Sequence, residues 1–152
     1  MSFDVQTIRI AIAVGIAVSM LWHEKKNLSP GGVIVPGVIA LYIFTKPLLI
    51  LYTIIVALGT YLLVKYISNY VILFGRRRFS VVMLMSFVLV WAMEYLGGLT
   101  ANSELEFRVI GFIIPGLIAN EMERQGIPQT ISALSVTTIA TAIIIFLLIG
   151  KV

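Results

Sequence analysis

The sequence predicts an all-α integral membrane protein that forms a single polytopic domain over residues 1–152. Apolar residues make up 60% of the chain and charged residues 12%, whereas a soluble domain has roughly 45–50% and about 25%. Seven acidic and eleven basic side chains are too few to cover the surface of a domain of this size. A soluble enzyme and a nucleic-acid-binding domain are therefore excluded, and the chain belongs in a lipid bilayer.

Six apolar segments follow one another along the chain. Four of them approach or exceed the roughly 20 helical residues needed to cross a bilayer, and they cover residues 5–22, 47–74, 79–96 and 131–150. The second and fifth segments, residues 28–44 and 109–119, contain glycine and proline. Because proline lacks an N–H and glycine tolerates unusual backbone angles, we expect helix breaks there. The residues expected at these breaks are Gly32, Pro36, Gly37, Gly111, Pro115 and Gly116.

The two interrupted segments share one pattern. Residues 32–40 and 111–119 both read Gly, three apolar residues, Pro-Gly, one aliphatic residue and Ile-Ala. The sequence therefore predicts two tandem three-segment repeats, residues 5–74 and 79–150, which are inverted if all six segments cross. Interrupted segments at equivalent places in two repeats indicate a binding or translocation site. The alternative is close helix packing at a kink without transport.

The basic residues predict the orientation of the segments. If all six cross, one face receives Lys25-Lys26, Arg76-Arg77-Arg78 and Arg124. The positive-inside rule then places this face in the cytoplasm and both termini outside. If the second and fifth segments re-enter instead, both termini lie inside and the charge bias weakens; six crossings are favoured.

Further residues are expected to act inside the bilayer. Arg9 and Glu94 lie near the ends of the first and fourth segments, where they are predicted to form an ion pair, unless each extends separately to the interface. Small residues recur every four positions in the first segment, which predicts a close helix contact; they are Ala11, Gly15 and Ser19.

No phosphate-binding loop is present, and His23 is the single histidine. We therefore expect no catalytic residue, no metal and no cofactor.

Several motifs together resemble those of the PgsC/CapC family. They are Leu28-Ser29-Pro30-Gly31-Gly32, Val35-Pro36-Gly37, Gly75-Arg76-Arg77-Arg78-Phe79, Glu106-Phe107-Arg108, Ile114-Pro115-Gly116-Leu117-Ile118-Ala119-Asn120 and Arg124-Gln125-Gly126-Ile127-Pro128. The resemblance covers nearly the whole chain. It departs from the family at Gly31, where alanine is expected, and at Arg78, where lysine is usual.

The resemblance implies a membrane subunit of the bacterial poly-γ-glutamate synthase complex, in the cytoplasmic membrane. The implied partners are a cytoplasmic ATP-dependent amide ligase, an outward-facing anchored subunit and the polymer itself. The chain is then not an enzyme by itself but anchors the ligase and helps pass the polyanion outward. A homo-oligomer is also expected, because six segments enclose little room for a polymer.

Arginines are the expected contacts for carboxylates, which guanidinium binds through two parallel hydrogen bonds. Arg108, beside the second break, is the first choice, and Arg76, Arg77 and Arg78 are the cytoplasmic candidates. The alternatives are a salt bridge of Arg108 to a nearby glutamate and a purely topological role for the arginine triplet. Two other functions stay open: a freestanding secondary transporter of a small anion such as glutamate, and an anchor without a conduit.

Overall fold

The computed structural model describes residues 5–97 and 105–149, with side chains described for residues 5–95 and 111–148. This part of the chain is helical and contains no strand. The six helices are α1 (Val5–Lys26), α2 (Val35–Thr45), α3 (Pro47–Ser68), α4 (Gly75–Gly97), α5 (Leu105–Gln125) and α6 (Ile127–Ile149). The predicted all-α fold is confirmed.

Four of these helices, α1, α3, α4 and α6, are long and apolar enough to cross a membrane. They correspond to the four long segments predicted from the sequence, although α3 already ends at Ser68, before a turn. Their outer surfaces are strongly apolar: Leu48 is 80% exposed and Phe146 is 68% exposed. Such surfaces are stable only in lipid, so the chain is a multi-pass membrane protein.

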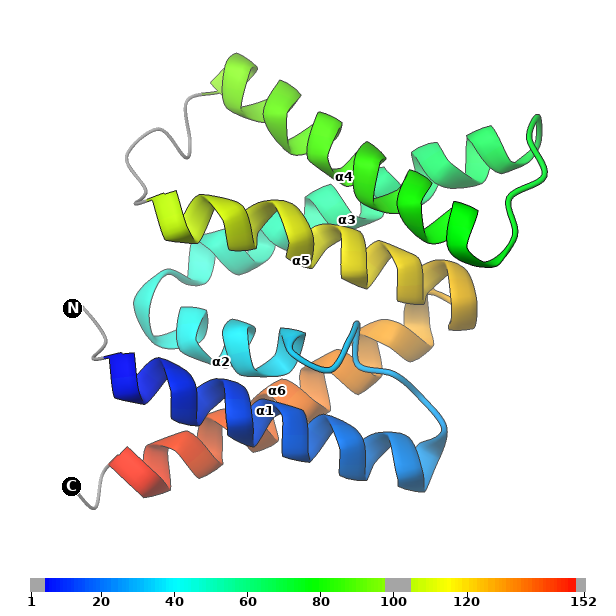
Figure 1. Cartoon of the computed structure of the whole chain (residues 1–152). Helices are drawn as coiled ribbons and strands as arrows, with labels where there is room; N and C mark the ends of the chain where they lie inside the picture. The colour runs from blue at the N-terminus through cyan, green and yellow to red at the C-terminus, as the bar shows by residue number, and fades with distance from the viewer. Residues whose placement is uncertain (1–4, 98–104, 150–152) are drawn as a thin grey trace.

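Consecutive helices run in opposite directions across the bundle, and the two ends of the described chain lie on the same side (Figure 1). The opposite side collects the last turn of α1, the connection from α3 to α4 and the turn between α5 and α6. This alternation of helix direction is the geometry expected if all six segments cross the bilayer. Helix α2, with 11 residues, is the short member.

The predicted helix breaks differ from the structure in both halves. In the first half the non-helical residues are 27–34, and they include Gly32, which has a φ of 116°. Pro36 and Gly37 lie inside the first turn of α2. An N–H in this turn has no acceptor within the helix, so proline can stand there without the loss of a hydrogen bond. The break therefore precedes the Pro-Gly pair.

In the second half the predicted break is wrong. Helix α5 runs from Leu105 to Gln125 through Gly111, Pro115 and Gly116. One proline removes a single backbone hydrogen bond, and a membrane helix tolerates this loss when neighbouring helices supply replacement contacts. Ser86 Oγ of α4 donates a hydrogen bond to Phe112 O at 3.1 Å, beside the Gly111 carbonyl that Pro115 leaves without its helical donor.

Glycines in the two halves serve close packing. A Cβ built on Gly15 of α1 would lie 2.5 Å from Gly37 Cα of α2, and one built on Gly37 would lie 2.7 Å from Ala11 O. The two backbones are therefore in direct contact. Ala11, Gly15 and Ser19 are all buried, as the small-residue spacing predicts.

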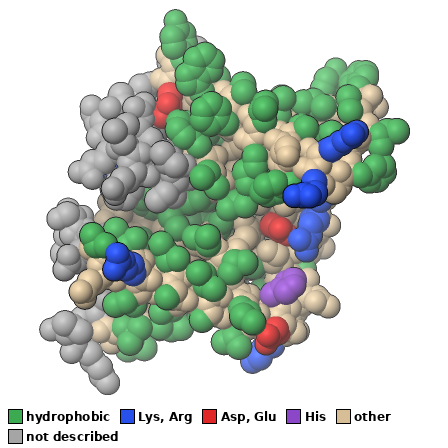
Figure 2. Space-filling model, in the orientation of Figure 1, with side chains coloured by type: hydrophobic (Ala, Val, Ile, Leu, Met, Phe, Trp, Pro, Cys, Tyr) green, Lys and Arg blue, Asp and Glu red, His purple; other side chains and the backbone are tan. Residues whose placement is uncertain are grey.

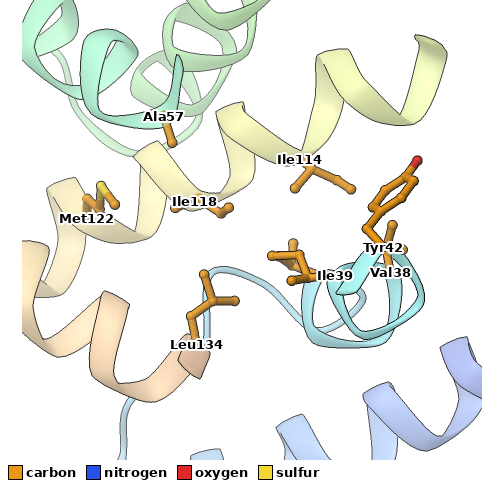
Figure 3. Packing of buried hydrophobic residues seen from close by; sticks show 9 residues of the cluster. Val38, Ile39, Tyr42, Ala57, Ile114, Ile118, Met122 and Leu134 are labelled. Carbon is orange, nitrogen blue, oxygen red and sulfur yellow. The ribbon is translucent and has the colours of Figure 1, made fainter. Parts of the chain in front are cut away.

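The core lies where α2 and α5 meet (Figure 3). Its buried side chains come from four helices and are Val35, Val38, Ile39, Tyr42, Ala57, Ile114, Ile118, Met122 and Leu134. Helix α1 packs against α2 and α6, whereas α4 packs against α3 and α5. The short helix α2 is thus held in the middle of the bundle, with its whole first turn buried.

Candidate functional site

Basic side chains gather at one end of the bundle, on the right in Figure 2. The last turn of α1 carries His23, Lys25 and Lys26, and the last turn of α5 carries Arg124. The first turn of α4 carries the arginine triplet Arg76-Arg77-Arg78. The basic loops predicted to share a face therefore do so.

The arginine triplet occupies an unfavourable end of its helix. A helix N-terminus carries a partial positive charge, which favours acidic rather than basic side chains, and the first turn of α4 contains no acidic residue. Arg76 and Arg77 are exposed, whereas Arg78 is half-buried and its Nε has no hydrogen-bond partner. This placement does not stabilise α4, and it makes the triplet a candidate contact for an anion from outside the chain.

A buried acid lies close to this basic end. Glu121 is 8% exposed, and its Oε1 lies 3.6 Å from Arg124 Nη1, while Oε2 has no hydrogen-bond partner. The sequence did not single out Glu121 as buried. The signal for its burial was its position on α5: Ile118 and Met122 belong to the core, and Gln125 also faces the interior, where it bonds to Ser29.

The irregular segment 27–34 is fastened to the second half of the chain. The Ser29 N–H donates to Gln125 Oε1 at 2.9 Å, and Gln125 Nε2 donates to Ser29 O and, at 3.0 Å, to Thr130 Oγ1. Gly31, with a φ of 78°, lies against Ile118. These contacts fix where α2 begins, and sequence reasoning missed them because Ser29 and Gln125 are far apart in the chain.

The first turn of α2 is enclosed by protein, whereas Val33 and Ile34 directly before it are 53% and 49% exposed. Val35 is fully buried, and the N-cap residue Ile34 offers no side-chain hydrogen bond to the first turn. On the neighbouring face of α1, Ser19 Oγ and Trp22 Nε1 are buried atoms without a hydrogen-bond partner. The spacing of small residues predicted only a packing role for Ser19.

The remaining predicted site residues are not brought together. Helices α1 and α4 make no contact over their described lengths, so the predicted ion pair of Arg9 with Glu94 is wrong. The reason is that α1 packs on α2 and α6, at the opposite edge of the bundle from α4 (Figure 1). The backbone of residue 108 belongs to α5, and the side chain of Arg108 lies outside the described residues.

An apolar cavity of about 210 Å³ lies between α2, α3, α5 and α6. Its lining includes Ile54 and Ile139 and contains no basic residue. The polar side chains in this lining are Ser135 and Thr138, so the cavity offers hydroxyls but no positive charge to a carboxylate. The candidate anion contacts are therefore the basic end and the buried start of α2.

Apolar helices that can cross a bilayer and a cluster of basic helix ends on one side define a multi-pass membrane protein with one basic face. Residues 14–131 match the family model described as capsule biosynthesis CapC. The chain belongs to this family. Over 138 residues it is 38% identical to the PGA biosynthesis protein CapC of Bacillus subtilis (strain 168), covering 90% of this chain and 92% of the relative.

A second relative is the capsule biosynthesis protein CapC of Bacillus anthracis. It is 37% identical over 123 residues, which cover 80% of this chain and 82% of the relative. No solved structure matches the chain. The resemblance to PgsC/CapC is confirmed, and the homologues connect the chain with capsule and poly-γ-glutamate biosynthesis.

Proposed function

We propose that this chain is a non-enzymatic membrane subunit of a poly-γ-glutamate synthesis and export complex. In this function it anchors the ATP-dependent ligase at the cytoplasmic face of the bacterial cytoplasmic membrane and helps pass the polymer outward. The observation that carries the proposal is the arginine triplet at the N-terminus of α4, with Arg76 and Arg77 exposed, beside the other basic helix ends. Carboxylates are the natural partners of such arginines, because a guanidinium binds them through two hydrogen bonds.

The basic end has two carboxylate-rich partners in such a complex. One is an acidic surface of the ligase, and the other is the growing polymer, which carries a free carboxylate on each γ-linked residue. Arg76 and Arg77 are exposed and reach a docked protein, whereas the half-buried Arg78 contacts the polymer. Arg108, near the start of α5 and therefore away from the basic end, is a further contact for the polymer by its place in the sequence. An outward-facing anchored subunit and further copies of this chain complete the proposed assembly.

We further propose that the two halves of the chain are inverted repeats. Helices α1, α2 and α3 run opposite to α4, α5 and α6, respectively (Figure 1). The packing partners also correspond, because α1 contacts α2 and α6 as α4 contacts α5 and α3. Both first helices bury every fourth residue; the sets are Ala11, Gly15 and Ser19 in α1, and Val82, Ser86 and Val90 in α4.

Buried threonines in the third helix of each half support the same proposal. Thr53 and Thr60 of α3 have the same spacing as Thr130 and Thr137 of α6. Each of the four hydroxyls donates to the carbonyl four residues earlier, at 2.8 Å in α3 and at 2.8 and 2.7 Å in α6. Such repeats are common in membrane transporters, with a site near their interface.

The function is tested in the producing bacterium. Deletion of the gene should abolish polymer at the cell surface and release the ligase from the membrane fraction. Substitution of Arg76, Arg77 and Arg78 by glutamine should reproduce part of this loss while the protein stays in the membrane. Lys46→Gln is the matched control, because Lys46 is an exposed base between α2 and α3, on the side of the bundle opposite to the basic end. Normal surface polymer in the deletion strain would contradict the proposal.

A freestanding transporter of a small anion such as glutamate is the second candidate. The observation that favours it is the irregular segment 27–34, which starts a short helix inside the bundle, as in transporter sites. The purified protein in liposomes should then move glutamate without partners. Absence of flux under an imposed gradient removes this candidate and leaves the first proposal untouched.

A further inference from the structure

The N-terminus of α2 is the one buried helix start that follows an irregular segment among the described residues. The helix has 11 residues and begins at Val35, which is fully buried. The first N–H groups of a helix have no acceptor within the helix, and they carry a partial positive charge. Ile34 provides no side-chain cap and Pro36 has no N–H, so the N–H groups of Val35 and Gly37 are the uncapped donors of this first turn.

Ser19 lies at the level of this helix start. Gly15 of α1 is in backbone contact with Gly37 in the first turn of α2, and the two helices run in opposite directions (Figure 1). Ser19 is one turn further along the same face of α1, about 6 Å from Gly15. It is 2% exposed and its Oγ has no hydrogen-bond partner. A buried hydroxyl without a partner is unusual in a folded protein and indicates a missing group.

Trp22 adds a second donor of the same kind. It follows Ser19 by three residues, so both lie on one side of α1. The indole N–H can only donate, and Trp22 Nε1 is buried without an acceptor. Two side-chain donors therefore lie at the level of a helix N-terminus.

The surrounding charges favour an anion at this position. His23, Lys25 and Lys26 form the last turn of α1, directly beyond Trp22. Glu24 in that turn is exposed. The buried Glu121 belongs to α5, which contacts residues 27–34 through Ile118 and Gln125, but Arg124 Nη1 lies 3.6 Å from Glu121 Oε1 and offsets its charge. The start of α2 therefore lies about one helical turn from the basic end, within reach of an anion attracted there.

We propose that the start of α2, with Ser19 Oγ and Trp22 Nε1, binds a carboxylate of an acidic peptide chain. The choice of a γ-linked glutamyl chain as this ligand rests on the proposed function. The site accepts one carboxylate in place of water: the hydroxyl and the indole donate to its oxygens, and the helix N-terminus stabilises its charge. Successive carboxylates of a polymer pass from the basic end to this position.

The purified full chain in detergent tests the site with a synthetic γ-linked glutamate trimer. The chain has two tryptophans, so Trp91→Phe leaves Trp22 as the only indole, and Trp91 is 62% exposed on α4. The fluorescence of this variant should change as the trimer is added. The Kd from calorimetry should match that of the wild type. Ser19→Ala and Trp22→Phe should each weaken binding by about tenfold or more, the loss expected for one hydrogen bond to a charged group.

Two controls make the result specific. Ser135→Ala removes an exposed hydroxyl on α6 that donates only to its own helix, and it should bind as the wild type does. A trimer with its carboxylates converted to amides should not bind. Wild-type affinity in both Ser19→Ala and Trp22→Phe, or equal binding of the neutral trimer, overturns the site. Circular dichroism checks that each variant keeps its helix content.

Failure of this site is distinguishable from failure of the proposed function. If the deletion strain loses surface polymer but the purified protein does not bind the trimer, the inferred site is wrong and the proposed function stands. If the deletion strain makes normal polymer while Ser19→Ala weakens trimer binding, the site stands as an anion site and the proposed function is wrong.

Discussion

The contact between α1 and α2 predicts a large loss of stability from a single methyl group at residue 15. A Cβ on Gly15 would lie 2.5 Å from Gly37 Cα and from Gly37 N, whereas carbon atoms pack at about 3.5–4.0 Å. The opposing atoms are backbone and cannot rotate away, so the two helices must separate by about 1 Å. Overpacking of this kind typically lowers the free energy of unfolding by about 1–3 kcal/mol.

The opposing gain from helix propensity is smaller. Alanine in a helix is favoured over glycine by roughly 0.5–1 kcal/mol, so Gly15→Ala should still lower the free energy of unfolding. Gly111→Ala is the matched control, because Gly111 is also helical and a Cβ there has no heavy atom within 4 Å. The control should therefore be neutral or slightly stabilised.

The assay is thermal unfolding in detergent, followed by circular dichroism. We expect the order of stability to be Gly111→Ala, then Gly116→Ala, then Gly15→Ala. Gly116 is intermediate because its added Cβ meets the end of a flexible side chain, Met83 Sδ, at 2.8 Å. A Tm for Gly15→Ala equal to that of Gly111→Ala would refute the direct backbone contact between α1 and α2.

Three smaller changes test other contacts. Gln125→Leu removes the hydrogen bonds to Ser29, and it should lower stability by about 1–3 kcal/mol and speed proteolysis of residues 27–34; unchanged cleavage would be inconsistent with this fastening. Glu121→Gln neutralises a buried carboxylate that has one unpartnered oxygen, so the Tm should stay equal or rise, and a marked fall would show that the charge is needed. Ser86→Ala should cost about 0.5–1.5 kcal/mol through the lost hydrogen bond to Phe112 O, and no change in Tm would count against that bond.

Much of the fold was predictable because lipid imposes a simple rule on the sequence. Helices long enough to cross a bilayer must be apolar, and the four long segments appear as α1, α3, α4 and α6. The basic clusters at Lys25-Lys26, the arginine triplet and Arg124 also fall at one end, since consecutive helices alternate in direction. The spacing of Ala11, Gly15 and Ser19 correctly predicted a close helix contact.

The pairwise contacts were not predictable in the same way. The position of a charge near a helix end fixes its depth but not its neighbour, which depends on the order of helices around the bundle. Arg9 and Glu94 have suitable depths for an ion pair, yet α1 and α4 lie at opposite edges. The unpartnered donors Ser19 and Trp22 carry no special sequence signal, because their significance comes from the start of α2 beside them.

The two Pro-Gly motifs illustrate why a shared pattern need not give a shared conformation. The residues before the first motif include Pro30, Gly31 and Gly32, and both glycines have positive φ. The corresponding residues before the second motif are Val109, Ile110 and Gly111. A β-branched residue such as Ile110 avoids positive φ, so the chain continues as a helix through Pro115.

This difference has a functional consequence for the proposed repeats. A helix start inside the protein exists at α2, whereas the corresponding point of α5 is in mid-helix and its N–H groups are bonded within the helix. The two halves therefore supply one interior carboxylate site rather than a symmetric pair. In the proposed function, this difference gives the path of the polymer a polarity, because the irregular segment 27–34 lies on the same side of the bundle as the basic end.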